Sequence, residues 1–189
     1  MNMSIVKSAL TIAGTDPTGG AGIQADLKVF QEREVFGMSV VTSVVAQNTE
    51  GVRSVKHLDV DFIEQQVDAV LDDIKPDAIK TGMIATVEMM ELIAKKLKNS
   101  TIPYVIDPVM VATSGDSLMD DTSRQVIRET LIPLATVVTP NIPEAEILTA
   151  MKIKNRDDQK EAAKYIVEEL GAKAAIVKGG HLTGKETED

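Results

Sequence analysis

The chain has 189 residues, which suits a single domain, and its 43% hydrophobic and 26% charged residues are typical of a soluble globular protein. A net charge of −9, dispersed basic residues and an aromatic content of 3% argue against the basic, base-stacking surface of a nucleic-acid-binding protein. The sequence has no cysteine, which excludes disulfides and thiolate metal sites, and no apolar run long enough for a membrane helix or a secretory signal, so we expect a cytoplasmic protein.

Short apolar runs recur along the chain, and each is typical of a strand buried on both faces of a parallel sheet. In chain order these predicted strands are residues 9–13, 39–46, 78–80, 104–106, 134–139 and 174–178. The segment 52–58 (VRSVKHL) is more polar, and we expect it to form an edge or surface strand.

Stripes of apolar residues at helical spacing lie between these runs and predict the helices. The stripes are Ile23, Leu27 and Phe30; Ile63, Val67, Val70 and Ile74; Met90, Ile93 and Leu97; and Ala163, Ile166, Val167 and Leu170. We expect Asp61 and Glu64 to form a capping pair, Thr86 to cap the third helix and Gly171 to end the last one. This alternation predicts an α/β domain, and a chain well below the ~250 residues of a TIM barrel favours an open sheet covered by helices.

The Gly-rich segment 14–22 follows the first predicted strand, at the edge where open α/β sheets bind ligands. It matches neither the dinucleotide fingerprint nor the P-loop, because Gly20 and Ala21 stand where a P-loop needs Lys and Ser or Thr. Its backbone N–H groups can still approach a small ligand or a phosphate. Asp26, about one turn into the next helix, can accept a hydrogen bond from a substrate hydroxyl; the alternative is an ordinary turn followed by a solvated aspartate.

Gln47 follows the second predicted strand, and its side chain offers a carbonyl oxygen and an amide N–H together. That pair matches the donor and acceptor edge of an aminopyrimidine, although an ordinary loop glutamine is the alternative. Met83 and Val109 follow the next two predicted strands, where they can supply apolar surfaces against a flat ring. Taken singly, both residues also fit an ordinary hydrophobic core.

The segment 139–144 (TPNIPE) follows another predicted strand, and Pro143 suits the first turn of a helix. Asn141 and Glu144 then lie near the helix start, where their oxygens can hold Mg²⁺ through water. Alternatively, Asn141 is an N-cap with Glu144 as its capping-box partner. Lys178, before two glycines at a strand end, can reach the phosphates of a nucleotide or be a solvated surface lysine.

The chain resembles the bacterial hydroxymethylpyrimidine and phosphomethylpyrimidine kinases in six segments with the same order and spacing: TIAGTDPTGGAGIQADLK, VVAQNTEGV, KTGM, DPVM, TPNIPEAE and KGGH. These kinases belong to the ribokinase-like superfamily. The resemblance implies one kinase domain over residues 1–189, with a three-layer α-β-α fold and a mostly parallel central sheet. Related pyridoxal kinases share the Gly-rich loop and the TPN segment and are an alternative, whereas Gln47 within AQNT favours the pyrimidine enzymes.

The same resemblance implies a function in thiamine biosynthesis. The enzymes use ATP and Mg²⁺ to phosphorylate 4-amino-5-hydroxymethyl-2-methylpyrimidine and then its monophosphate to the diphosphate, and the resemblance suggests a homodimer. Five residues would line the pyrimidine pocket: Gly14, Asp26, Gln47, Met83 and Val109. Asp26 would face the hydroxymethyl group and Gln47 the aminopyrimidine edge. Asn141 and Glu144 would serve the Mg²⁺–phosphate region, with Glu144 as the metal residue, and Lys178 would be the catalytic residue at the ATP phosphates.

One departure from the family pattern concerns the end of the chain. Complete members continue past KGGH to a Gly-Thr-Gly-Cys or Gly-x-Gly-Asp segment that makes the anion hole for the transferred phosphoryl group, whereas here a polar tail, residues 183–189, follows. We therefore expect a domain truncated before the anion-hole segment, with the C-terminal part of the fold missing. Such a chain would retain the pyrimidine pocket but transfer phosphate poorly, and an inactive ligand-binding fragment is the remaining alternative.

Overall fold

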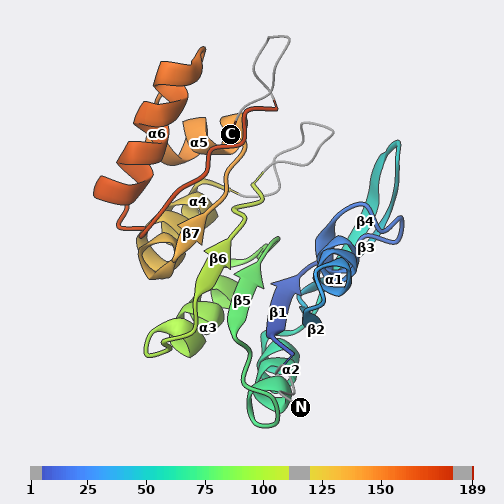
Figure 1. Cartoon of the computed structure of the whole chain (residues 1–189). Coiled ribbons are helices and arrows are strands. Elements are labelled where there is room, and N and C mark those ends of the chain that lie inside the picture. Colours follow the sequence, from blue (N-terminus) through green and yellow to red (C-terminus); the bar gives the residue numbers. More distant parts are fainter. Residues whose placement is uncertain (1–5, 111–119, 181–188) are drawn as a thin grey trace. The chain divides into compact units, whose positions relative to one another are not determined.

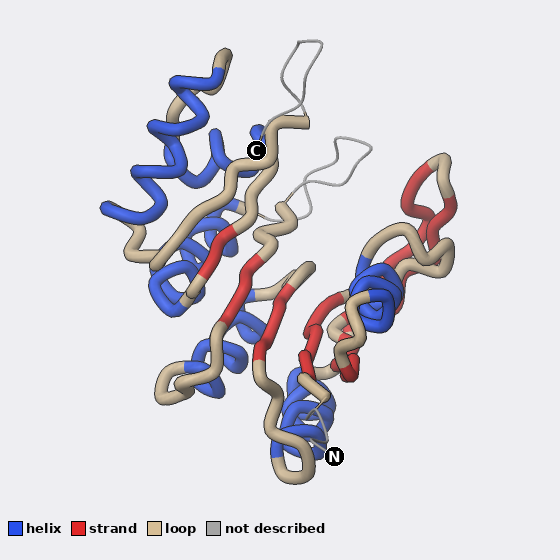
Figure 2. Tube along the Cα trace, viewed as in Figure 1, coloured by secondary structure: helices blue, strands red, loops and turns tan. Residues whose placement is uncertain are grey.

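The computed structural model describes residues 6–110, 120–180 and 189, in which strands and helices alternate (Figures 1 and 2). These residues fall into two compact units, unit 1 within residues 1–84 and 101–103, and unit 2 within residues 85–100 and 104–189. Most strands of each unit's main sheet are parallel, and helices follow them in sequence, which confirms the predicted α/β class. Within the described ranges, no helix combines the length and the apolar character needed to cross a membrane.

Three parallel strands form the sheet of unit 1, in the order β2 (Phe36–Val41), β1 (Ser8–Ala13) and β5 (Ala78–Thr81). All six residues of β1 are buried, as expected for a central strand covered on both faces. In its register, Thr11 of β1 pairs with Lys80 of β5, so two polar residues lie side by side in a mostly apolar sheet.

A two-stranded antiparallel hairpin, β3 (Ser43–Asn48) and β4 (Gly51–His57), projects from the parallel strands of unit 1 (Figure 1). The prediction of one strand over 39–46 is therefore wrong. The strand is interrupted at Thr42, which is fully buried. The Thr42 hydroxyl donates a hydrogen bond of 2.9 Å to the carbonyl oxygen of Met83. β-Branched residues suit the strands on both sides of the break, so their run gives no sign of it. The predicted polar strand is confirmed by β4, which is largely exposed.

Two helices complete unit 1, α1 (Gly22–Glu32) and α2 (Val60–Leu71). Both begin within a few residues of the predicted stripes and bury members of them, whereas the last residue of the second stripe lies beyond α2. The predicted capping pair of Asp61 and Glu64 is wrong, because Asp59 is the N-cap residue of α2 and Asp61 lies inside the first turn. A carboxylate in the first turn is still favourable there, since it faces the positive end of the helix dipole.

Unit 2 contains the parallel pair β6 (Tyr104–Ile106) and β7 (Val137–Val138). The predicted strand over 134–139 shrinks to β7, because the chain before it forms the 3₁₀ helix η2 (Ile132–Leu134), which includes a proline. Proline fixes φ near −65° and donates no hydrogen bond, so it suits this tight turn better than a strand. The predicted strand over 174–178 appears as two isolated parallel bridges rather than as a continuous ladder.

The helices of unit 2 carry most of its buried apolar residues. They are α3 (Val87–Leu97), α4 (Asp121–Val126), the π-helical turn η1 (Ile127–Leu131), α5 (Ile142–Thr149) and α6 (Arg156–Glu168). Thr86 caps α3 as predicted, since its hydroxyl accepts a hydrogen bond of 3.3 Å from the N–H of Met89. Gly171, with φ of +81°, follows the last helix in the left-handed region, as predicted for a helix end.

Candidate functional site

The Gly-rich turn of unit 1, residues 14–22, is organised by the carboxylate of Asp16, of which 3% is exposed. Its oxygens accept hydrogen bonds from the backbone N–H groups of Thr18 (2.9 Å), Gly20 (3.0 Å) and Ala21 (2.8 Å), and from the Thr18 hydroxyl (2.9 Å). The sequence predicts that backbone N–H groups of this turn can bind a ligand, but these three N–H groups already donate to Asp16, a residue of the turn itself. Asp16 was not predicted as a site residue, and an aspartate before Pro-Thr-Gly-Gly is the turn signal that could have revealed it.

Two predicted pocket residues, Gly14 and Met83, lie in contact within unit 1. A Cβ atom at Gly14 would come 2.6 Å from the terminal methyl carbon of Met83, closer than real contacts allow. Gly22 has φ of +58°, and a Cβ there would collide with the carbonyl oxygen of Gly14. The turn therefore requires glycine at position 22, whereas a side chain at position 14 would displace the end of Met83.

Gln47 lies near the end of β3, and its side chain is close enough to the Asp16 carboxylate to help lower the pKa of Asp16. The backbone of β3 is also joined to the turn. The N–H of Thr15 donates to the carbonyl oxygen of Ser43 (2.9 Å), and the N–H of Val45 donates to the Thr15 hydroxyl (2.9 Å). The structure thus brings Gln47 and the Gly-rich turn together, as the predicted pyrimidine pocket requires.

The environment of Asp16 keeps its carboxyl group ionised. Burial raises the pKa of Asp16, but hydrogen bonds from Gln47, Thr18 and Ala21 outweigh burial and lower the pKa to about 2. At neutral pH the side chain is therefore a carboxylate, which accepts hydrogen bonds and donates none.

Asp26 lies on α1 and is held by two side chains of the sheet, neither of which was predicted as a site residue. Its Oδ2 accepts hydrogen bonds from the Thr11 hydroxyl (2.6 Å) and from Lys80 Nζ (2.8 Å), and its Oδ1 accepts a second one from Lys80 (3.0 Å). The Lys80 and Asp26 side chains are 22% and 18% exposed, so the ion pair is largely buried. A Thr and a Lys within apolar strands are the sequence signal that could have found these partners.

Helix α1 also joins Asp26 to the Gly-rich turn. Gln24, two residues before Asp26, accepts a hydrogen bond of 2.8 Å from the N–H of Asp16 through its side-chain oxygen. Gln47 and Asp26 are therefore both attached to one turn of unit 1.

A second cluster, in unit 2, contains Lys178, Asp107 and Glu144. Lys178 Nζ lies 2.9 Å from Asp107 Oδ1, and the two side chains are 40% and 26% exposed. The backbone fixes the position of Lys178, because its N–H donates to the carbonyl oxygen of Pro140 (2.8 Å). Asp107 belongs to the DPVM segment, but the sequence did not predict it as a site residue.

Asn141 and Glu144 form a capping box at the start of α5, which confirms the structural alternative considered for them. The Asn141 side chain accepts from the Glu144 N–H (2.9 Å), and Glu144 Oε2 accepts from the Asn141 N–H (2.8 Å). Burial raises the pKa of Glu144, and the negative charge of Asp107 raises it further. The hydrogen bond from Asn141 lowers the pKa but does not outweigh these effects, so the pKa stays above its usual value. Glu144 therefore lies close enough to Asp107 and Lys178 for both charges to affect its pKa.

The chemistry of this cluster fits a metal–phosphate group better than a bare metal ion. The two carboxylates can hold a Mg²⁺ ion that keeps most of its water ligands, and the lysine can bind the phosphates that this ion neutralises. Among the residues that the structure describes, no three His, Asp or Glu side chains gather as a metal site of their own. Val109, whose N–H donates to the Asp107 carbonyl oxygen (2.9 Å), lies in unit 2, whereas the other four predicted pocket residues lie in unit 1. His181 and the tail residues 183–188 lie outside the described residues.

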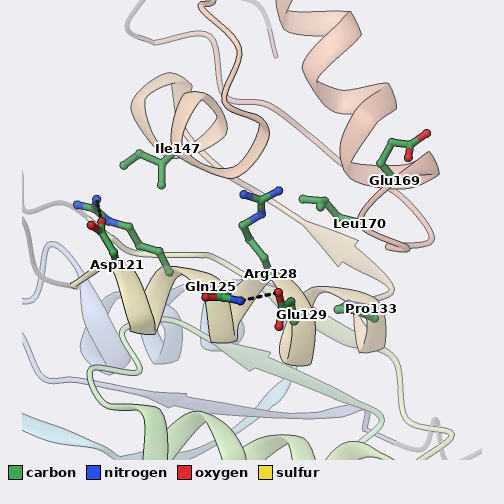
Figure 3. Close-up of a pocket in the computed structure, with 9 residues that line it drawn as sticks. Asp121, Gln125, Arg128, Glu129, Pro133, Ile147, Glu169 and Leu170 are labelled. Carbon is green, nitrogen blue, oxygen red and sulfur yellow. Dashed lines mark hydrogen bonds and ion pairs between the residues drawn. The ribbon is translucent and has the colours of Figure 1, made fainter.

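A hollow of about 740 Å³ in unit 2 is lined by α4 and η1 and by residues from α5 and the end of α6 (Figure 3). It contains Arg124 and Arg128, but also Asp121, Glu129 and Glu169. Its charges are mixed, and none of the predicted site residues lines it. The hollow is thus separate from the cluster around Lys178.

Comparison with known proteins shows the family to which the chain belongs. The sequence profile of the phosphomethylpyrimidine kinase family matches residues 16–189. A hydroxymethylpyrimidine/phosphomethylpyrimidine kinase of Staphylococcus aureus (strain MRSA252) is 54% identical over 176 residues, which cover 93% of this chain and 64% of that protein. The kinase of the same description from Bacillus subtilis (strain 168) is 53% identical over 180 residues, covering 95% of this chain and 66% of that protein. The chain thus spans about two thirds of the length of these curated relatives.

Solved structures give the same picture. The phosphomethylpyrimidine kinase of Clostridium difficile 630 matches with a TM-score of 0.87 and 46% identity, over 95% of this chain and 78% of that one. The pyridoxal kinase of Staphylococcus aureus in complex with AMP-PCP matches with a TM-score of 0.87 and 38% identity, over 97% of this chain and 67% of that one. These likenesses confirm the fold class expected from the sequence.

Proposed function

The chain belongs to the phosphomethylpyrimidine kinase family, and from this membership we propose that it serves the ATP-dependent phosphorylation of 4-amino-5-hydroxymethyl-2-methylpyrimidine and its monophosphate. The observation that carries the proposal is that β3, which bears Gln47, and α1, which bears Asp26, are both hydrogen-bonded to the Gly-rich turn of unit 1. The Gln47 amide, which would pair with the ring edge, and the Asp26 carboxylate, which would contact the hydroxymethyl group, then both lie on elements joined to one turn.

In unit 1, we propose that the pyrimidine ring lies against the Met83 side chain, which packs closely over Gly14. Gln47 would pair with the amino group and the adjacent ring nitrogen, as Gln pairs with adenine. Asp26 would accept a hydrogen bond from the hydroxymethyl group, and its ion pair with Lys80 would hold the carboxylate in position. The contact of Val109 with the ring stays a prediction.

In unit 2, we propose that Lys178 binds the phosphates of ATP, and that Asp107 and Glu144 hold Mg²⁺ through its water ligands. Mg²⁺ would neutralise the charge on the phosphates during transfer. Lys178 would supply a second positive charge there, and its pairing with Asp107 keeps the ammonium group in place before the nucleotide arrives. Phosphoryl transfer needs mainly positioning and charge stabilisation, which this set of residues can supply.

Pyridoxal kinase activity is the second candidate, supported by the structural likeness to the Staphylococcus aureus pyridoxal kinase. The pairing ability of Gln47 favours the aminopyrimidine, because pyridoxal lacks an amino group beside a ring nitrogen. We also propose a homodimer and a cytoplasmic location, of which sedimentation equilibrium tests the first and cell fractionation the second.

Titration calorimetry of the 189-residue chain with 4-amino-5-hydroxymethyl-2-methylpyrimidine, and separately with pyridoxal, tests the proposal. We expect binding of the aminopyrimidine, and a loss of at least about tenfold in its affinity in Gln47→Ala, since one bidentate pair contributes ~1–3 kcal/mol. ADP release in the presence of ATP, Mg²⁺ and each ligand then measures transfer. Binding of pyridoxal in preference to the aminopyrimidine, or unchanged affinity in Gln47→Ala, would contradict the assignment.

A further inference from the structure

The ion pair of Asp26 and Lys80 lies near the carboxyl end of the unit 1 sheet, where the pyrimidine is proposed to bind. Lys80 belongs to β5, and its side chain extends toward the end of that strand, because a Cβ atom at Gly82 would lie 3.3 Å from Lys80 Nζ. Met83, the proposed neighbour of the ring, is the next residue along the chain. The ammonium group therefore lies close to the proposed pocket as well as to Asp26.

Hydrogen bonds fix this ion pair but leave it partly accessible. Lys80 Nζ donates to both oxygens of Asp26, at 3.0 and 2.8 Å, and the hydroxyl of Thr11, a fully buried residue, donates to Oδ2 at 2.6 Å. The two charged side chains are still partly exposed, at 22% for Lys80 and 18% for Asp26. A ligand group that reaches the Asp26 carboxylate therefore also meets the Lys80 ammonium group.

The two proposed substrates differ in charge at the group that Asp26 would contact. The first has an uncharged hydroxymethyl group, whereas its monophosphate has a phosphate ester with a charge of about −1.5 to −2 at pH 7. A carboxylate alone suits the hydroxyl, from which it accepts a hydrogen bond, but it repels a phosphate, and salt screens this repulsion little in a partly buried site. One pocket therefore binds both substrates more readily when a nearby cation cancels the charge of Asp26.

We propose that Lys80 is a specificity-determining residue: it allows the pocket beside Asp26 to bind a phosphate monoester as well as the uncharged alcohol. The inference rests on the proposed function. The charge of Lys80 cancels that of Asp26, so the pair as a whole does not repel an anion. An ammonium group has three N–H groups, and the two hydrogen bonds to Asp26 occupy two of them, which leaves the third for a phosphate oxygen.

Calorimetry without ATP tests the inference by comparing the affinities of the 189-residue chain for 4-amino-5-hydroxymethyl-2-methylpyrimidine and for its monophosphate at one ionic strength. We expect the natural chain to bind both compounds, with affinities within about tenfold of each other. Lys80→Met leaves the charge of Asp26 uncancelled, so we expect it to lose at least about tenfold more affinity for the monophosphate than for the alcohol. Lys80→Arg keeps the charge, and we expect the ratio of the two affinities to stay within about threefold of the natural ratio.

Lys7→Met is the matched control for Lys80→Met. Lys7 also pairs with an aspartate of unit 1, Asp77, at 2.7 Å, but it precedes β1 and so lies at the opposite end of that strand from the Gly-rich turn. We expect its ratio of affinities to equal that of the natural chain. A similar change of the ratio in both variants would show that the net charge of the chain controls binding, and the inference would be wrong.

Asp26→Asn separates this role of Lys80 from a purely structural one. The asparagine oxygen can still accept a hydrogen bond from Lys80, but the positive charge of Lys80 is no longer cancelled. We expect the ratio of affinities to shift toward the monophosphate by at least about threefold, in the direction opposite to that of Lys80→Met. The loss of a purely structural contact would instead weaken both ligands alike in both variants.

The outcomes distinguish this inference from the proposed function. If the natural chain binds the alcohol but not the monophosphate, or if Lys80→Met weakens both ligands by the same factor, the inference is wrong and the proposed binding of the alcohol stands. If the natural chain binds neither compound, both are wrong.

A measurement on the natural chain covers the case in which Lys80→Met does not fold. The ¹⁵Nζ signal of Lys80 is followed by NMR and is assigned by its loss in Lys80→Arg. We expect the monophosphate to shift this signal more than the alcohol does, because a phosphate oxygen would accept a hydrogen bond from Nζ. Equal shifts with the two ligands would overturn the inference.

Discussion

Asp16 in unit 1 and Glu144 in unit 2 are equally buried, each with 3% of its surface exposed, yet their pKa values shift in opposite directions. Burial raises the pKa of both carboxyl groups. Around Asp16, several N–H and O–H donors outweigh burial and lower the pKa to about 2. Around Glu144, burial is the largest cause, the negative charge of Asp107 adds to it, and the few donors do not outweigh them, so the pKa stays above its usual value.

The difference shows that burial alone does not tell what a carboxylate does. Asp16 has enough donors to be stable as an anion without any ligand, which suits a residue that organises a turn. Glu144 is an anion that its surroundings satisfy incompletely, and an added cation would relieve that deficit. The first carboxylate therefore organises its own turn, whereas a positively charged ligand would stabilise the second one.

The largest effect that we expect comes from removing the carboxylate of Asp16. Asp16→Ala leaves the N–H groups of Thr18, Gly20 and Ala21 without their acceptor, and a buried donor without a partner costs about 1–3 kcal/mol. We expect the free energy of unfolding, measured with urea, to fall by about 3 kcal/mol, given partial access of water to the turn.

The matched control for this variant is Asp61→Ala, since Asp61 is an exposed aspartate in the first turn of α2. Its loss removes a favourable helix-dipole interaction and we expect it to cost less than about 1 kcal/mol. Equal losses in the two variants would mean that the hydrogen bonds to Asp16 contribute no more than a surface charge does.

A pH series separates the two carboxylates by the sign of their effects. The pKa of Asp16 is lowered from 3.8 to about 2, so its contribution to stability is present above pH 3.8 and is lost as the pH falls toward 2. This lowering of the pKa corresponds to at most about 2 kcal/mol, and solvent screening reduces the contribution further. The pKa of Glu144 is raised above 4.5, so its contribution is present below pH 4.5 and is lost as the pH rises through the raised pKa.

Urea unfolding of the natural chain, Asp16→Asn and Glu144→Gln between pH 2.5 and pH 8 measures both effects. Relative to the natural chain, Asp16→Asn should lose less stability on acidification below about pH 4. Glu144→Gln should lose less stability as the pH rises above about 4.5. The comparison between the two carboxylates would be wrong if both variants changed the pH profile in the same direction.

The sequence predicted where the candidate site residues lie in the fold better than it predicted their partners. Buried strands such as β1 and β5 are recognisable from their apolar runs, and the loops that follow them are therefore recognisable as well. The interruption of the strand at Thr42 is not recognisable in the sequence, because a hydrogen bond to the distant Met83 carbonyl oxygen stabilises it. Local sequence preferences carry no information on such a contact.

The same limit applies to the polar partners of the site. Lys80 lies 54 residues from Asp26, and Lys178 lies 71 residues from Asp107, so neither ion pair leaves a local pattern. The capping box joins Asn141 and Glu144, which are three positions apart, and its pattern is visible in the sequence. Contacts between neighbours along the chain could be predicted, and contacts that the fold creates could not.

The separate roles of the two regions lead to a prediction for Lys178. Lys178→Met removes the ammonium group that would bind the ATP phosphates but keeps much of the side-chain volume. We expect the affinity for ATP, measured by calorimetry with Mg²⁺ present, to fall at least about tenfold, or ~1.4 kcal/mol. The affinity for the aminopyrimidine should stay unchanged, since its proposed contacts with Gln47 and Met83 lie in unit 1.

Lys152→Met is a matched control for Lys178→Met, because Lys152 is an exposed lysine of unit 2 that pairs with Glu146 and lies outside the cluster. We expect it to bind ATP as the natural chain does. A similar loss of ATP affinity in both variants would show that general charge, not the cluster around Lys178, attracts the nucleotide.

The smallest effect concerns the stability of Glu144 variants at pH 8. Glu144→Gln keeps an oxygen for the Asn141 N–H but removes a buried charge beside Asp107, so the lost hydrogen-bond strength and the relieved repulsion nearly cancel. We expect its free energy of unfolding to stay within about 0.5 kcal/mol of the natural value, whereas Glu144→Ala, which also loses half of the capping box, should be less stable by about 1 kcal/mol. Urea unfolding without metal measures both variants. Equal destabilisation of the two would mean that the charge of Glu144 itself stabilises the fold, and Glu144 would then lack the electrostatic deficit that a cation is proposed to relieve.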